Sequence, residues 1–402
     1  VLRPDYKADE LSSLGEDAVH QARYLEHIAH CPVYGNTETE YYPLGELCFT
    51  RMVEELKRAE RYIFVEYFII EEGKMWDTIL DILKDKAQEG VDVRVMYDDI
   101  GSMFTLPRDY ARELEARTGI KCCVFNPFVP ILSLRLNNRD HRKIMVIDGK
   151  VAFTGGINLA DEYINEKVKY GHWKDSAIQV RGEAAWSMTV MFLTLWDYVR
   201  EKATEDYDAF RPPVLPEIQA PGFVQPYTDN PLDCEAVGQA VYLNLINKAR
   251  RYVYITTPYL IVDDSTNTAL CIAAKSGVDV RIMTPHIPDK RVVFELTRSH
   301  YQPLLESGVK IYEYTPGFVH AKNFAVDDKY GTVGSINLDY RSLFLHFENG
   351  VWLCNDPSIR DIRADFLSTL EQCQSVTLAQ CRALPWWRKA VRAVLRVFAP
   401  LM

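Results

Sequence analysis

Two stretches of the chain carry the same reactive side chains at the same spacing. The first, "HRKIMVIDGKVAFTGGIN", runs from His141 to Asn158, and the second, "HAKNFAVDDKYGTVGSIN", runs from His320 to Asn337. In each, a lysine follows the histidine two residues later, an aspartate follows it seven residues later, and Gly-(Gly/Ser)-Ile-Asn closes the stretch. Two such stretches that face each other would offer two imidazoles, two ammonium groups and two carboxamides.

This doubled set of side chains suits a phosphodiester. The lysines and asparagines can hold an anionic phosphoryl group and stabilise charge in the transition state. One histidine can attack phosphorus and form a phosphohistidine, while the other protonates the leaving oxygen and later deprotonates an incoming hydroxyl. Because the lysines supply the positive charge, we expect no metal and no cofactor. The predicted catalytic residues are His141, Lys143, Asn158, His320, Lys322 and Asn337.

The elements around these residues are predicted to be β-hairpins. His141 and Lys143 are two apart on an expected strand, so their side chains leave the same face. A buried run, 144–147, leads to an Asp148-Gly149 turn and a returning strand at 151–154. Asp148 and its counterpart Asp327 are expected to hold the turns and not to touch phosphate.

Small residues follow each returning strand and lie near the start of its motif. They would let a ligand approach the backbone, and we predict that they form phosphate loops. These residues are Gly155, Gly156, Gly334 and Ser335.

The repeat extends beyond the two motifs. "ELKRAERYIFVEYFII" (55–70) matches "LINKARRYVYITTPYL" (245–260), and "EGVDVRVMYDD" (89–99) matches "SGVDVRIMTPH" (276–286). Each pair indicates a helix followed by a buried strand, and a repeat this long indicates a duplicated domain. We therefore predict the α/β class, with two pseudo-symmetric α/β sandwich halves and the site at their interface.

The predicted domain boundaries follow from the repeat and from proline content. The linker at 210–231 contains six prolines and is expected to have little helix or strand. The predicted parts are an N-terminal segment (1–40), a first domain (41–209), the linker (210–231), a second domain (232–383) and a C-terminal helix (384–402).

Composition narrows the class of protein. The chain has 402 residues and a formal net charge of -10, which disfavours nucleic-acid binding because duplex affinity rests on neutralised phosphates. Its nine cysteines are an odd number without a C-x-x-C pair, which indicates reduced thiols in a cytosol-facing protein.

The doubled H-x-K-x-x-x-x-D pattern with its G-(G/S)-x-N tail resembles the phospholipase D superfamily. The segments "FVEYFII", "NNRDHRKIMVIDGKVAFTGGINLADEY", "WKDSAIQVRG", "TTPYL" and "GSINLDYRSLFLHFE" are most similar to bacterial cardiolipin synthases. This resemblance implies that two phosphatidylglycerols are joined into cardiolipin with release of glycerol, and that His141 is the nucleophile. A hydrolytic phospholipase D and a phosphatidylserine synthase stay open as alternatives, followed by a metal-independent nuclease and a non-catalytic lipid-binding protein.

The resemblance also implies that a downstream carboxylate orients each histidine. Asp175 lies downstream of His141, and Glu348 lies downstream of His320. The other histidines, His346 among them, are interpreted as structural. Arg139 and Arg142 are interpreted either as phosphate contacts or as solvated charges.

Two apolar segments are candidates for contact with lipid. The C-terminal segment combines tryptophans with cations, which suits the interface of an anionic bilayer, although a core-packed terminal helix is the alternative. Its predicted membrane-binding residues are Trp386, Trp387, Arg388, Lys389, Arg392 and Arg396. Residues 125–138 are interpreted either as a buried strand or as an apolar lip at the site, and 184–199 as a buried helix.

These observations set the expected partners and location. We expect phosphatidylglycerol, cardiolipin and an anionic membrane surface as partners, and no nucleic acid. The oligomeric state is left open, with a homodimer as one arrangement. The expected location is the cytoplasmic side of a bacterial cell membrane. Because the family commonly carries N-terminal membrane helices, we expect such an anchor to precede Val1.

Overall fold

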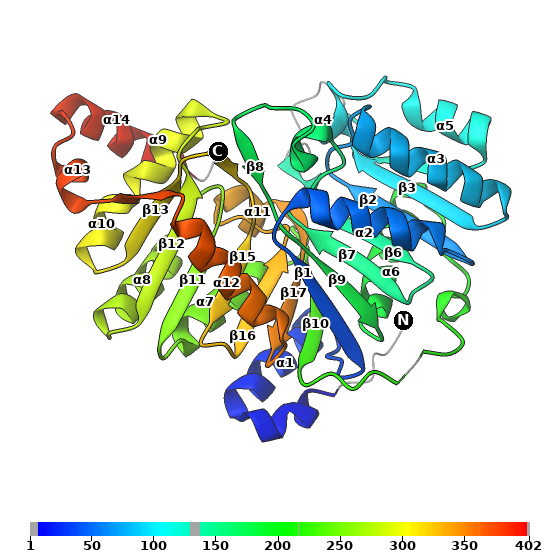
Figure 1. The fold of residues 1–402 in the computed structure, drawn as a ribbon, viewed down its shortest axis with the longest axis horizontal. Helices are drawn as coiled ribbons and strands as arrows, with labels where there is room; N and C mark the ends of the chain where they lie inside the picture. Colours follow the sequence, from blue (N-terminus) through cyan, green and yellow to red (C-terminus); the bar gives the residue numbers. More distant parts are fainter. Residues whose placement is uncertain (1–6, 129–136, 216, 400–402) are drawn as a thin grey trace.

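Each half of the chain forms one β-sheet covered by helices, and the two halves lie side by side (Figure 1). The computed structural model describes residues 7–128, 137–215 and 217–399. The prediction of two α/β sandwich halves is confirmed.

The first sheet has seven strands in the order β1-β9-β7-β6-β2-β3-β4. β2 runs parallel to β3 and antiparallel to β6, so the motif hairpin joins the sheet at its centre. The strands are β1 (Thr37–Tyr42), β2 (Tyr62–Tyr67), β3 (Asp92–Asp98), β4 (Lys121–Phe125), β6 (Lys143–Ile147), β7 (Val151–Gly155) and β9 (Ala177–Gly182).

The second sheet repeats this order as β10-β17-β16-β15-β11-β12-β13 and adds β18 beside β13. Its strands are β10 (Phe223–Asp229), β11 (Tyr252–Thr256), β12 (Asp279–Pro285), β13 (Lys310–Tyr314), β15 (Asn323–Val326), β16 (Tyr330–Gly334), β17 (His346–Cys354) and β18 (Cys373–Val376). The matched order shows that the duplication covers the whole sheet and not the motifs alone.

Helices cover both faces of each sheet because strand side chains alternate between the faces. In the first half, Phe64 stacks on Phe192 of α6 (Ala185–Arg200) at 4.6 Å between ring centroids, while its neighbour Val65 packs with α2 (Gly45–Lys57) and α3 (Lys74–Gln88). In the second half, Tyr254 stacks on α12 (Ser358–Leu370) and Phe324 on α7 (Val237–Lys248). The predicted buried helix at 184–199 is confirmed as α6.

The remaining α-helices are short or peripheral. They are α1 (Glu16–Ile28), α4 (Asp99–Ser102), α5 (Tyr110–Thr118), α8 (Asp264–Lys275), α9 (Arg291–Ser299), α10 (Tyr301–Glu306), α11 (Tyr340–Phe344), α13 (Leu378–Arg382) and α14 (Trp386–Val397). Among the described residues, no helix combines the length and apolar character that crossing a bilayer requires.

Two short parallel pairings cross from one half to the other. β5 (Arg139–Asp140), which leads into His141, pairs with the start of β17. β14 (Gly317–Val319), which leads into His320, pairs with β8 (His172–Lys174). The segment before each motif histidine therefore lies beside the segment before the carboxylate of the other half.

The predicted linker at 210–231 contains a strand, so its boundary at 231 is wrong. β10 lies inside this range and pairs with β17 along its whole length, so it belongs to the second sheet. Prolines hid this strand, but Pro226 lies on an edge strand, where a residue without an N–H group is tolerated.

The N-terminal segment predicted at 1–40 also ends earlier than expected. β1 begins at Thr37 and belongs to the first sheet. Before it, Tyr34 exchanges two backbone hydrogen bonds of 2.9 Å with Val224 of β10, and α1 packs against α7. The described part of this segment therefore packs on the second half.

Candidate active site

The two motifs form matching β-hairpins. The turn between β6 and β7 has positive φ at Asp148 (54°) and Gly149 (67°), and the turn between β15 and β16 has positive φ at Asp327 (56°) and Asp328 (58°). A two-residue turn of this kind matches the right-handed twist of the strands. Each hairpin therefore fixes the position of the histidine and lysine at its open end.

The motif aspartates anchor the closed ends of the hairpins. The Asp148 carboxylate accepts backbone N–H groups of Glu60, Arg61 and Tyr62 at 2.7–2.9 Å. Asp327 accepts the equivalent N–H groups of residues 250–252 at 2.7–2.8 Å. Each aspartate thus ties its hairpin to the start of the neighbouring strand, β2 or β11, at the end away from the histidine.

Each motif histidine is paired with the carboxylate of the opposite half. His141 Nδ1 lies 2.8 Å from Glu348 Oε1, and His320 Nδ1 lies 2.6 Å from Asp175 Oδ2. The expectation that each histidine uses the carboxylate downstream in its own half is therefore wrong. The cause is the pairing of β5 with β17 and of β14 with β8, which brings each histidine to the carboxylate of the other half.

Backbone hydrogen bonds fix this crossed arrangement. The His141 N–H donates to the Phe347 carbonyl at 2.9 Å, and the His320 N–H donates to the Lys174 carbonyl at 2.7 Å. With Nδ1 held by a carboxylate, the tautomer is set and Nε2 is the ring nitrogen left for chemistry. Neither half can build this unit alone.

The motif lysines are buried beside the histidines. Lys143 Nζ donates to the His141 carbonyl at 2.5 Å, and Lys322 makes the same bond to His320. Burial lowers the pKa of Lys143 to about 7 and that of Lys322 to about 8, although Glu348 and Asp175 oppose this effect. Both ammonium groups therefore titrate close to neutral pH, where an anionic ligand would favour their charged form.

The histidines are held in their neutral form. Burial, with Lys143 and Lys322 acting in the same direction, lowers the pKa of His141 to about 3 and that of His320 to about 4. Burial alone would raise the pKa of Glu348, but His141, His346 and Lys143 more than offset it and the pKa falls to about 2. The pKa of Asp175 is lowered in the same way by His320 and Lys322. At neutral pH the site thus offers neutral imidazoles oriented by ionised carboxylates.

The two asparagines have unequal surroundings. Asn158 Oδ1 accepts the Ile69 N–H at 3.0 Å, and its Nδ2 donates to the Tyr163 hydroxyl at 2.8 Å. Asn337 Oδ1 is buried without a hydrogen-bond partner among the described residues. Asn158 therefore fixes the loop after β7, and phosphate contact by either asparagine stays a prediction.

The small residues at the ends of β7 and β16 make room for the carboxylate strands. A Cβ atom on Gly156 would lie 2.1 Å from Asp175 Oδ1, and one on Gly334 would lie 2.5 Å from the Asn349 carbonyl oxygen. A Cβ atom on Gly155 would lie 2.3 Å from the Ser176 carbonyl oxygen. Ser335 takes the place of Gly156 and donates its hydroxyl to Glu348. A phosphate loop at these residues stays a prediction.

Arg139 and Arg142 are buried in ion pairs. Arg139 Nε lies 3.0 Å from Asp98 Oδ2, and Arg142 Nε lies 2.6 Å from Glu66 Oε1. Both arginine side chains are at most 4% exposed. They are therefore not solvated charges. Arg139 Nη1 and Arg142 Nη2 are buried without a hydrogen-bond partner among the described residues, so contact with phosphate stays a prediction.

A family model described as "Cardiolipin synthase, PLD-like domain" matches residues 52–188 and 242–370. These ranges cover more than half of the chain and include both motifs and both carboxylates. The chain belongs to this family.

Curated relatives and solved structures agree with this assignment. Cardiolipin synthases of Halalkalibacterium halodurans and Geobacillus sp. are 34% and 37% identical, each over 98% of this chain and 78% of its own length. An uncharacterized protein of Streptococcus mutans is 50% identical over 95% of this chain and 82% of its own length. A phosphatidylserine synthase of Haemophilus influenzae has a TM-score of 0.69 over 94% of this chain and 97% of its own, and at 16% identity it supports the fold alone.

In this member of the PLD-like cardiolipin synthase family, His346, which was interpreted from the sequence as structural, lies beside His141. Its ring centroid lies 5.5 Å from that of His141. The first half has Trp173 at the matching position, with its ring 5.5 Å from His320. The signal was its spacing, because a residue two before Glu348 on a strand shares its face.

The arginines of the C-terminal helix α14 face α9, so the alternative of a core-packed helix with a charged outer side is wrong. Arg388 and Arg392 pair with Glu295 of α9 at 2.7 and 2.8 Å, and Arg396 donates to Ser299 at 3.1 Å. Lys389 donates to the Arg382 carbonyl at 2.9 Å. The expectation that these cations face a membrane is thus wrong for the arginines paired with Glu295, which supplies their counter-charge.

The opposite side of α14 is apolar and exposed. Exposed fractions are 80% for Trp386, 57% for Val394 and 76% for Val397. Figure 1 shows α14 and α9 together at one upper corner of the molecule, with α4 along the same edge. The predicted apolar lip at 125–138 lies largely outside the described residues.

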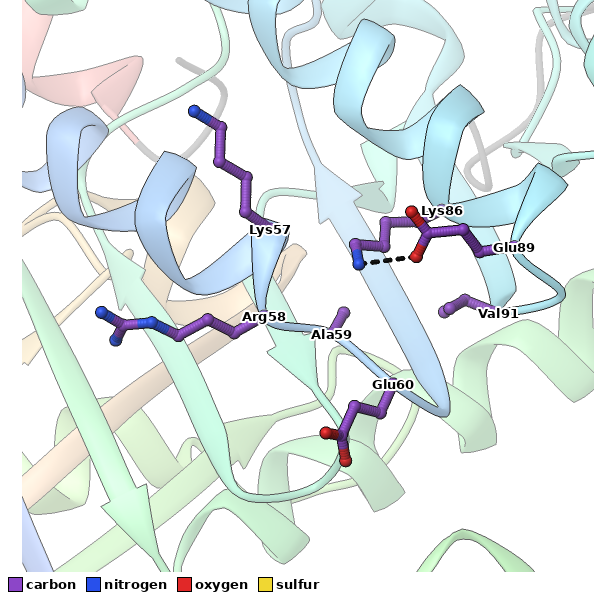
Figure 2. Close-up of a pocket in the computed structure, with 7 residues that line it drawn as sticks. All are labelled: Lys57, Arg58, Ala59, Glu60, Lys86, Glu89 and Val91. Atoms are coloured by element: carbon purple, nitrogen blue, oxygen red, sulfur yellow. Dashed lines mark hydrogen bonds and ion pairs between the residues drawn. The ribbon is translucent and has the colours of Figure 1, made fainter.

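A surface pocket of about 490 Å³ lies away from this site (Figure 2). It is lined by Lys57, Arg58, Ala59, Glu60, Lys86, Glu89 and Val91, with an ion pair of 2.8 Å between Lys86 and Glu89. These residues precede β2 and β3, whereas Lys143 pairs with the last residue of β2. The pocket therefore lies at the opposite edge of the sheet from the histidines.

Proposed function

We propose that the protein is a cardiolipin synthase that acts through a phosphohistidine. It transfers a phosphatidyl group from one phosphatidylglycerol to a hydroxyl of a second and releases glycerol. The observation that carries this proposal is the crossed pairing, in which each half gives one histidine and one carboxylate. Family membership supports phosphatidyl transfer as the reaction.

In the first step, Nε2 of His141 attacks phosphorus and the bond from phosphorus to the glycerol headgroup breaks. His320 gives a proton to the departing oxygen, so glycerol leaves as a neutral alcohol. Lys143 and Lys322 stabilise the charge on the phosphoryl oxygens. We assign attack to His141 by family resemblance, since the two halves are nearly symmetric.

In the second step, His320 takes the proton of a hydroxyl on the second phosphatidylglycerol. The alkoxide oxygen attacks phosphorus and the phosphorus–nitrogen bond to His141 breaks, which yields cardiolipin. The His320 imidazole thus acts as acid in the first step and as base in the second. Its pKa is low in the unliganded site and rises when an anionic phosphodiester binds beside it, so it can carry the proton that the first step needs. No external reductant, oxidant or nucleotide is needed for this balance.

We further propose that the protein works at the cytoplasmic surface of a bacterial cell membrane. The exposed apolar side of α14 would lie in the interface, with Trp386 and Trp387 at headgroup level. Phe104, which is 94% exposed beyond α4, would contact the same surface from the first half. The helices α14 and α4 both lie along the upper edge of the molecule in Figure 1.

The reaction is tested with vesicles of phosphatidylglycerol as the sole lipid. We expect cardiolipin and glycerol in equal amounts, with turnover lost in His141→Asn and in His320→Asn while both variants stay folded. Phosphatidic acid without cardiolipin would replace the proposal with a hydrolytic phospholipase D. Turnover in both variants at the wild-type rate would exclude the phosphohistidine.

A further inference from the structure

His346 is a partly buried residue whose two ring nitrogens are buried and have no hydrogen-bond partner among the described residues. Its side chain is 11% exposed, and Nδ1 lies 3.8 Å from Glu348 Oε1, which is too long for a hydrogen bond. Buried polar groups without a partner are uncommon and call for an explanation such as a ligand or a catalytic role. The His346 ring is therefore available to bind something at this site.

His346, His141 and Glu348 together have the spacing of a metal-binding cluster. The nitrogen or oxygen atoms that they offer all lie within 4.8 Å of one another. Glu348 Oε1 lies 2.8 Å from His141 Nδ1 and 3.8 Å from His346 Nδ1. Ligand atoms around a tetrahedral zinc ion are separated by roughly 3.4 Å, so these two distances bracket the required value.

The cluster surrounds only one of the two motif histidines, His141. At the matching position of the first half, Trp173 lies against His320, and an indole offers no metal ligand. Among the described residues, this is the one group of three or more His, Cys, Asp or Glu side chains with such spacing. Duplication therefore does not account for it.

We propose that a borderline divalent cation of the zinc class binds to His141, His346 and Glu348 and inhibits phosphatidyl transfer. Two imidazoles and one carboxylate suit zinc, whereas calcium and magnesium prefer ligand sets made of oxygen. The cation takes the place of the proton that His141 Nδ1 donates to Glu348. A water molecule completes the fourth position.

This inhibition rests on the proposed function, in which His141 attacks phosphorus. While His141 holds the cation in this geometry, Glu348 cannot orient its ring for that attack. The ammonium groups of Lys143 and Lys322, which donate to the His141 and His320 carbonyls, repel a second positive charge, so binding is reversible and competes with catalysis. The cation is an inhibitor here and has no part in the reaction.

Binding is measured by calorimetric titration of the whole protein with zinc in the absence of lipid. We expect one zinc per chain for the wild type. In His346→Asn, or in His346→Gln as a second variant, affinity falls at least about tenfold, as for the loss of metal-site partners in general. Zinc held elsewhere, for example at the exposed thiol of Cys234, would remain in these variants.

Two control variants leave the cluster intact. His286→Asn removes another imidazole paired with a glutamate, Glu313, at 2.8 Å, and should bind zinc like the wild type. His320→Asn removes the other candidate catalytic histidine and should also keep zinc binding. If His346→Asn binds zinc as tightly as the wild type, or if the wild type binds none, the proposal is overturned.

Inhibition is measured as cardiolipin formation in buffered zinc, with each variant compared with its own rate without zinc. The wild type should be inhibited and then restored by a chelator, and the midpoint should rise at least about tenfold in His346→Asn. An unchanged midpoint overturns the proposal. If the wild type forms no cardiolipin without zinc, the proposed function fails, and the binding titration decides the zinc site independently.

Discussion

At the scale of residues, the site consists of two histidine–carboxylate pairs, and each pair takes one residue from each half of the chain. Glu348 and Asp175 differ in length by one methylene, and Ser335 donates to Glu348 where Gly156 only makes room for Asp175. The two histidines are therefore held by different networks within one symmetric frame. Substitutions that act on one pair at a time can separate their roles.

Replacement of Glu348 by glutamine should uncouple His141 and spare His320. The amide cannot stabilise an imidazolium or fix the tautomer as a carboxylate does, so kcat/KM for cardiolipin formation should fall roughly 10²- to 10⁴-fold. Nitrogen NMR of the ring should show a changed tautomer at His141 alone. Glu313→Gln, which alters the His286 pair outside the site, is the matched control. An effect on His320 instead would contradict the crossed pairing.

The activity should decline on the alkaline side in two stages. Burial lowers the pKa of Lys143 to about 7 and that of Lys322 to about 8, so each lysine is charged below its value and loses its charge as pH rises through it. The profile of kcat/KM between pH ~6 and ~10 should show both losses. In Lys322→Arg the guanidinium stays charged, so the later stage should move to higher pH even if the rate is lower. An identical decline in both proteins would assign it to another group.

At the scale of elements, the hairpins and α14 have separable tasks. The hairpins bring the reactive ends together, and their turns are anchored by aspartates that lie away from the site. α14 is joined to α9 through its arginines, which leaves its apolar side outward. We predict that the anchored turns govern stability and that the outward side of α14 governs binding to a membrane.

Asp148→Asn should lower stability without removing the chemistry. The carboxylate accepts three backbone N–H groups, and an amide places an N–H group of its own against one of them. We expect a loss of about 1–3 kcal/mol in the free energy of unfolding, measured with urea. Asp81→Asn, at a 74% exposed carboxylate in a surface ion pair, should change stability little. Loss of turnover in a fully folded Asp148→Asn would contradict the anchoring role.

Charge on the outer side of α14 should weaken binding to vesicles. Val394→Asp and Val397→Asp each remove apolar contact with the interface. Binding is measured as the fraction of protein that sediments with phosphatidylglycerol vesicles, and each variant should bind at least about fivefold more weakly than the wild type. The control is Val214→Asp. The Val214 side chain is 76% exposed, like that of Val397, but it lies in the linker region, so this variant should bind vesicles like the wild type. Equal binding of all three variants would exclude α14 as the membrane contact.

At the scale of the whole molecule, the duplication could be predicted from the sequence, but the crossed pairing of histidines and carboxylates between the halves could not. Matching motifs and matching GVDVR segments predict two α/β halves and name the histidines and lysines. The crossed carboxylates depend on pairing between β5 and β17 and between β8 and β14, which are distant in the chain and set by tertiary packing. Proline content hid β10 for a different reason, because an edge strand tolerates a residue that cannot donate.

Burial also limited what the sequence could predict about charge. The spacing of Arg139 and Arg142 beside His141 gives no sign that both are enclosed in ion pairs with Asp98 and Glu66. In the same way, Glu295 lies far from α14 in the chain, so the inward turn of its arginines could not be foreseen. Such pairs are decided by which elements meet, and a single motif carries no information about its partner.

Trapping the covalent intermediate tests the central claim most directly. The enzyme is quenched while it converts phosphatidylglycerol, and its peptides are analysed by mass spectrometry under conditions that preserve phosphorus–nitrogen bonds. We predict a phosphatidyl adduct on His141 and none in His141→Asn. An adduct on His320 would keep the mechanism and exchange the two roles. Cardiolipin formation with no adduct on either histidine would contradict the account.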